Sequence, residues 1–147
     1  MNKEFVPYQE ALELKELGFD EPCFAYREST FGKEKVIVEP SGLITNTNFS
    51  KIFGETRFRL VTPTFSKAFR WFRDKYKLHH SIDYECSQHD HTWGYNWSIY
   101  NYNQVVKTDE EYITSHPDAP AGEWVYDSDG EAELACLRKL IEIVKNC

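Results

Sequence analysis

The 147-residue chain lacks the features that mark exported or membrane-spanning proteins. It has only four cysteines, none of them in a C-x-x-C pair, and a domain of this length does not need disulfides to fold. No apolar run approaches the roughly 20 residues that a membrane-spanning helix requires. The first residues, MNKEF, do not continue into the long apolar stretch of a signal peptide. We therefore expect a soluble cytoplasmic protein with reduced thiols and no membrane partner.

Motifs of several common enzyme classes are also missing from the sequence. It contains no G-x-x-x-x-G-K-[ST], no G-x-G-x-x-G and no G-x-S-x-G. Residues 127–131 (DSDGE) resemble the start of a calcium loop but lack its later ligands, and Ser128 with Glu131 fits a helix capping box better. These absences favour a non-enzymatic protein.

The chain is rich in aromatic residues, and its charge is unevenly distributed along the sequence. Phe, Tyr and Trp make up 16% of the residues, so most of the apolar area available for a core is aromatic. The net charge is −7, but residues 55–78 alone carry a net +5 and the remainder −12. An acidic protein does not coat nucleic acid over its whole surface, although one basic segment can still meet an anionic partner.

Periodicity predicts three helices and up to six short strands. The helices are expected at 8–17, 63–77 and 129–145, and the strands at 23–27, 36–38, 56–61, 79–86, 93–102 and 124–126. The order is α-ββ(β)-α-ββ(β)-α, with strands in adjacent hairpins. This order predicts an α+β fold with a mainly antiparallel sheet of four to six strands, formed as a single domain over residues 1–147. Residues 41–54 and 105–122 are expected to be long loops.

The middle helix has an apolar and a basic side. Its apolar stripe consists of Phe65, Ala68, Phe69, Phe72 and Tyr76. Arg70 and Arg73 lie on the opposite side, Trp71 on the flank, and Arg57 and Arg59 shortly upstream. Basic residues interleaved with aromatics suit a phosphate backbone or an acidic protein. The alternative is a solvated amphipathic helix, and we take the five residues as candidate partner contacts.

Residues 93–102 alternate as a strand does. Trp93, Tyr95, Trp97 and Ile99 are expected on one side. The other side carries Asn96, Ser98, Tyr100 and Tyr102. Tyr and Asn surfaces suit adaptable recognition, so Tyr100 and Tyr102 are also candidate partner contacts. The same face is alternatively covered by another element or buried between the subunits of a homodimer.

A cluster of metal-ligating residue types follows the strand at 79–86. Cys86, His89 and His91 supply the thiolate and imidazole ligands that zinc prefers, although their spacing is not that of a zinc finger. Three interpretations stay open: a polar connection with exposed histidines, a zinc site, or a Cys86 nucleophile with a histidine base.

Three stretches resemble a family of small uncharacterised bacterial and bacteriophage proteins. They are LGFDEPC at 17–23, AFRWFRDKY at 68–76, and EAELACL at 131–137 followed by Ile141 and Val144. The resemblance implies a cytoplasmic protein carried on a mobile element and assigns no activity or site residue.

From the sequence we favour a non-enzymatic binding or accessory module that recognises a macromolecular partner, either protein or nucleic acid. Two alternatives remain. One is a metal-binding or histidine-using enzyme centred on Cys86, His89 and His91. The other is an acidic, dimerising structural protein.

Overall fold

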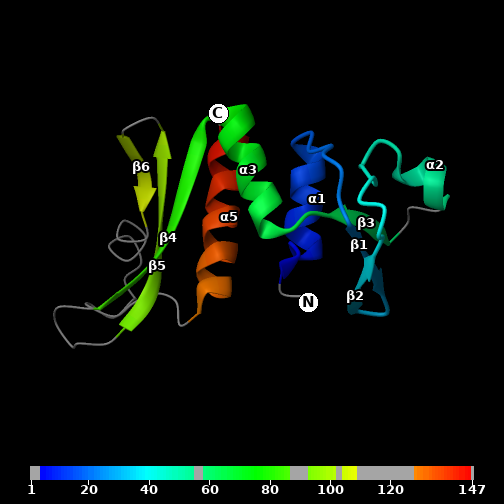
Figure 1. The fold of residues 1–147 in the computed structure, drawn as a ribbon, viewed down its shortest axis with the longest axis horizontal. Helices are drawn as coiled ribbons and strands as arrows, with labels where there is room; N and C mark the ends of the chain where they lie inside the picture. Colours follow the sequence, from blue (N-terminus) through cyan, green and yellow to red (C-terminus); the bar gives the residue numbers. More distant parts are fainter. Residues whose placement is uncertain (1–3, 55–57, 87–92, 102–103, 109–127, 147) are drawn as a thin grey trace. The chain divides into compact units, whose positions relative to one another are not determined.

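The computed structural model describes residues 4–54, 58–86, 93–101, 104–108 and 128–146. These residues form four helices and two three-stranded antiparallel sheets, which confirms the predicted α+β class and antiparallel pairing (Figure 1). The strands are divided between two sheets, whereas the sequence predicted one. No helix in these ranges is long and apolar enough to span a membrane.

The chain divides into two compact units, Met1–Ala68 and Phe69–Cys147. The boundary falls inside α3 (Phe65–Tyr76), the amphipathic helix that the sequence predicted. Phe65, Ala68, Phe69 and Phe72 are buried, as their helical spacing requires. That residues 1–147 form one domain stays a prediction.

The sheet of the first unit has the order β2–β1–β3. It consists of β1 (Ala25–Thr30), β2 (Lys33–Val38) and β3 (Arg59–Thr62), and α1 (Tyr8–Glu16) packs against β3. Phe31 and Gly32 form the two-residue turn between β1 and β2, with φ of +53° and +76°. Two positive φ values match the twist of a tight hairpin, but a phenylalanine is uncommon in the left-handed region.

A short helix, α2 (Phe49–Phe53), lies within the segment that was predicted to be a loop. Before it, the Thr45 N–H donates to Asn48 Oδ1 (2.7 Å) and the Asn48 N–H donates to Thr45 Oγ1 (3.1 Å). Phe49 then packs edge-on against Tyr26, with 5.3 Å between the ring centroids. Thr and Asn side chains predict a loop because they bond to nearby backbone, yet here the same bonds begin a helix.

The buried guanidinium of Arg27 attaches the N-terminal segment of the chain to the first sheet. Arg27 Nε donates to the Val6 carbonyl (2.6 Å), Nη2 donates to the Phe5 carbonyl (3.0 Å), and Nη1 lies 3.3 Å from a carboxylate oxygen of Glu34. Thr62 Oγ1 also donates to the Val6 carbonyl (2.6 Å). A buried charge is tolerated only when it is bonded in this way, so these contacts determine where the N-terminal segment lies.

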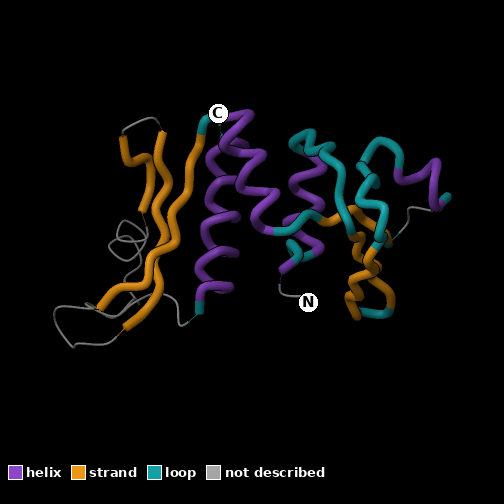
Figure 2. Tube along the Cα trace, in the orientation of Figure 1, coloured by secondary structure: helices purple, strands orange, loops and turns teal. Residues whose placement is uncertain are grey.

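The second unit places a long helix on a sheet of order β4–β5–β6 (Figures 1 and 2). The strands are β4 (Leu78–Cys86), β5 (Trp93–Asn101) and β6 (Gln104–Thr108). The helix, α5 (Asp129–Lys145), packs against β4 and β5. Ser128 Oγ accepts from the Glu131 N–H (3.2 Å), which confirms the predicted cap.

Replacing Arg27 tests the buried anchor. Arg27→Met leaves the Phe5 and Val6 carbonyls and the Glu34 carboxylate without their cation, so we expect the free energy of unfolding to fall by about 3 kcal/mol. Arg59→Met is the matched control, because Arg59 lies 3.9 Å from Glu28 in a half-exposed ion pair worth less than about 1 kcal/mol. Urea denaturation followed by circular dichroism measures both losses. Equal losses would contradict the anchoring role.

Candidate binding site on the second sheet

The β4–β5 pairing gives the second sheet two chemically different faces. Residues directly opposite each other share a face, and the register pairs His79 with Tyr100 and Ser81 with Ser98 on one of them. The register places eight residues of these two strands on this polar face, and the described side chains among them are His79, Ser81, Asp83, Asn96, Ser98 and Tyr100. The alternation predicted for residues 93–101 is therefore confirmed.

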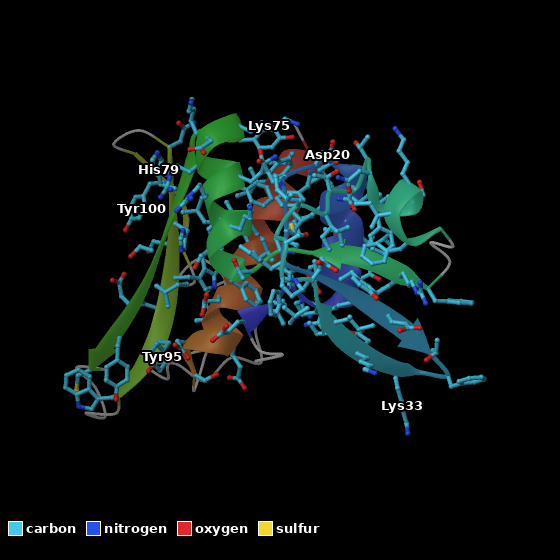
Figure 3. The ribbon with its side chains drawn as sticks, turned by 45° about the vertical axis from the view of Figure 1, so that its right-hand side comes forward. Asp20, Lys33, Lys75, His79, Tyr95 and Tyr100 are labelled. Atoms are coloured by element: carbon cyan, nitrogen blue, oxygen red, sulfur yellow. The ribbon has the colours of Figure 1, made fainter. Side chains whose placement is uncertain are left out.

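The polar face does not have the geometry of a catalytic triad. Ser81 Oγ donates to Asp83 Oδ2 (2.8 Å), so the carboxylate holds the serine rather than orienting a histidine. His79 lies two residues before Ser81, a separation of about 7 Å along a strand. His79 is exposed and Tyr100 half-exposed, and Figure 3 shows them on neighbouring strands. The described side chains of this face therefore form a polar surface.

The opposite face changes from buried to exposed along the strands. Trp97 and Ile99 are 2% and 0% exposed on the face that α5 covers. Farther along the same face, Tyr84 and Trp93 are 56% and 61% exposed. Each strand has nine residues, a length of about 30 Å, so the sheet extends beyond the part that buries its side chains.

Tyr84, Trp93 and Tyr95 form a stack of rings on this exposed part, here called the aromatic cluster. The rings of Tyr84 and Trp93 lie 5.2 Å apart and nearly parallel, at 29°. Those of Tyr84 and Tyr95, which are directly opposite each other across the strands, lie 4.8 Å apart. Exposed apolar groups gathered in one place commonly mark a binding surface.

The sequence missed the aromatic cluster. Alternation correctly placed Trp93 and Tyr95 on the side of Trp97, but it did not indicate how much of that side is buried. Tyr84 joins them only through the register that sets it opposite Tyr95. The sequence does show an aromatic residue at each of these three positions. It does not show the strand register, which is needed to bring the three together.

The basic side of α3 agrees with the prediction only in part. Arg70 and Arg73 are exposed, whereas Trp71 is 7% exposed, and its part in a partner contact stays a prediction. Its ring packs edge-on against Phe72 (5.1 Å), and Lys75 Nζ lies 5.0 Å from its centroid. A flank position next to the apolar stripe widens that stripe instead of facing water.

Several predicted contacts lie elsewhere or outside the described residues. Arg59 belongs to the first unit, where it pairs with Glu28, whereas Arg70 and Arg73 belong to the second. Arg57 and Tyr102 lie outside the ranges that the structure describes. Their part in a contact surface stays a prediction.

The predicted metal ligands are not brought together within the described ranges. Cys86 is half-buried at the end of β4, and His89 and His91 lie outside the described residues. Among the residues that are described, no group of three or more His, Cys, Asp or Glu side chains is placed to hold a metal ion. Burial raises the pKa of the Cys23 thiol to about 12, which makes this cysteine unreactive.

His80 is a half-buried residue whose ring packs against α3. Its ring stacks on Phe69 with 3.7 Å between centroids and 13° between planes. Burial lowers its pKa, and the charges of Arg73 and His79 lower it further. The ring is therefore held neutral, which suits an apolar contact.

Comparison with known protein families, curated proteins and solved structures finds no match to this chain. The resemblance to small bacterial and bacteriophage proteins stays a prediction. Function has to be argued from the residues themselves.

The pKa of His80 predicts a pH dependence of stability. In the unfolded chain a histidine binds a proton near pH 6.5, whereas folded His80 binds it only at lower pH. The unfolded state then holds more protons, so stability falls as the pH drops from 7 to 5. His80→Gln should flatten this fall, measured by urea denaturation across the range. His79→Gln, at the exposed neighbour, should keep most of it, and equal flattening by both variants would contradict the assignment.

Proposed function

We propose that this protein is a non-enzymatic binding module that holds a macromolecular partner on the aromatic cluster. The supporting observation is the exposure of Tyr84 and Trp93, at 56% and 61%, in a stack built on paired strands. Each such ring offers about 150–250 Å² of contact area, and Trp and Tyr are the residue types most enriched at the energetic centres of interfaces.

The described polar groups of the second unit favour binding over catalysis. A reaction needs a nucleophile or base within hydrogen-bond reach of the bound group. Ser81 and Asp83 bond to each other on the opposite face of the sheet, and His80 stacks on Phe69. These three side chains are therefore not placed to transfer a proton to a group bound on the exposed rings.

Two further surfaces of the same unit are candidates for the edge of this contact. Arg70 and Arg73 are exposed on α3, and Tyr100 is half-exposed on the polar face. Interfaces place apolar anchors at the centre and polar or charged groups at the rim. The proposal therefore makes the aromatic cluster the anchor and gives Arg70 and Arg73 at most a peripheral part, whereas Tyr100, on the opposite face of the sheet, lies outside this contact.

A double substitution tests the anchor. Tyr84→Ser with Trp93→Ser should leave the thermal midpoint unchanged, because both rings are largely exposed, and should abolish partner capture. Proteins captured from an extract by the tagged full chain are identified by mass spectrometry. Binding is then measured again with the purified partner, for which we expect at least a 30-fold loss of affinity, equivalent to about 2 kcal/mol.

Phe31→Ser is the control for this test. Phe31 is a fully exposed aromatic at the β1–β2 turn of the first unit, so its removal changes surface hydrophobicity to a similar degree. Partner affinity should be kept in this variant. Unchanged affinity in the Tyr84/Trp93 double variant would show that the partner binds elsewhere.

A further inference from the structure

The aromatic cluster lies at the end of the second sheet where α5 begins. Figure 1 shows the first residues of α5 (orange) at the same end of the unit as the last residues of β4 and the first residues of β5, and Figure 3 shows Tyr95 beside the start of α5. α5 contacts both strands, on the face that carries the aromatic cluster. Among the described residues, the side chains of its first two turns therefore contribute to the charge that an incoming group meets.

Those first turns are acidic. Asp129 and Glu131 are exposed, and Glu133 is half-buried on the side of the helix that also carries Leu137 and Ile141. Burial and the charge of Asp129 raise the pKa of the Glu133 carboxyl, as expected where negative charge accumulates. In sequence, residues 109–133 contain nine acids and neither lysine nor arginine.

The helix N-terminus does not reverse this sign. It contributes the equivalent of about half a positive charge, less than the three carboxylates beside it. Its first N–H groups are also in use, since Gly130 N–H donates to Asp129 Oδ1 (2.9 Å) and Glu131 N–H donates to Ser128 Oγ (3.2 Å). These two N–H groups are therefore not available to an anion, which the described carboxylates would also repel.

One exposed lysine of the unit lies away from the cluster. Figure 3 shows Lys75, near the end of α3, at the opposite end of the unit from Tyr95. A nucleic acid stacking its bases on the rings would bring its phosphates close to the carboxylates of α5, which costs energy. A cation, in contrast, is attracted both by the faces of the aromatic rings and by the carboxylates.

We infer that the aromatic cluster binds a cationic side chain, an arginine in particular, from a basic segment of a partner protein. The inference rests on the proposed binding function and adds the chemistry of the partner. Arginine is favoured over lysine because its planar guanidinium can lie flat on the exposed Trp93 ring and extend the existing stack.

The experiment uses the full chain and three short peptides of the same length. They carry two arginines, two citrullines or two glutamates, with blocked ends. Citrulline keeps the planar shape of arginine without its charge. Binding is followed at pH 7.5 and 50 mM salt through the Trp93 indole N–H signal in two-dimensional NMR, which is assigned by its loss in Trp93→Phe.

Titrations followed through the Trp93 signal should give the arginine peptide at least a tenfold higher affinity than the citrulline peptide. The glutamate peptide should not bind. Glu131→Gln with Glu133→Gln should weaken arginine binding about threefold to tenfold while keeping the fold, as should raising the salt to 500 mM. Glu142→Gln, farther along α5, is the matched control and should have little effect.

Equal binding of the arginine and citrulline peptides, or tighter binding of a ten-nucleotide oligothymidine to the same signal, would overturn the inference. Either result leaves the proposed binding function intact, because the cluster would still hold a ligand. If the Tyr84/Trp93 double variant still binds the partner, the proposed function is overturned, whatever the peptides show.

Discussion

The register of the β4–β5 pairing is the constraint on which the second unit depends. Nine consecutive pairs, from Leu78 with Asn101 to Cys86 with Trp93, decide which side chains share a face. A slip of one residue would turn every side chain of one strand to the other face. Trp97 and Ile99 would then leave the core formed with α5, so the burial of these two residues maintains the register. The exposed rings farther along the strands keep their positions as a consequence.

This dependence explains why the surface rings can be a good binding anchor. Tyr84, Trp93 and Tyr95 lie on paired strands and pack against one another, so their rotamers are restricted before any partner arrives. A preformed surface loses less conformational entropy on binding than a loop does. The same stacking also covers part of each ring, which limits the apolar area left in water.

Local patterns predicted local features well. The capping box at Ser128, the apolar stripe of α3 and the alternation of β5 each depend on neighbours within a few residues, and all three are confirmed. The division into two sheets was not predictable in this way. It depends on pairs such as Ala25 with Thr62, which are distant in sequence and leave no periodic signal. The helix α2 was missed because Thr45 and Asn48 favour turns and helix starts alike.

The two tryptophans Trp71 and Trp93 show most clearly what periodicity omits. Trp71 was placed on the flank of its helix and is buried, whereas Trp93 was placed on the same side as the buried Trp97 and is exposed. Periodicity gives the direction of a side chain but not how far the covering element extends. Trp71 is buried because the buried side of α3 is wider than the stripe of residues at helical spacing. Trp93 is exposed because only part of the length of β5 is covered on that face. A candidate site at the limit of a covered face is therefore found only from the structure.

The acids at the start of α5 have a sufficient structural reason to be there. Carboxylates near a helix N-terminus stabilise the helix by about 0.3–1 kcal/mol each, and many helices carry them without binding anything. Asp129, Glu131 and Glu133 alone would therefore say nothing about function. Their significance comes from the neighbouring rings, because an aromatic face and a carboxylate attract the same kind of ligand, a cation. Carboxylates at a helix N-terminus are expected both for helix stability and for binding a cation. Only the aromatic rings beside them distinguish a binding site from an ordinary helix start.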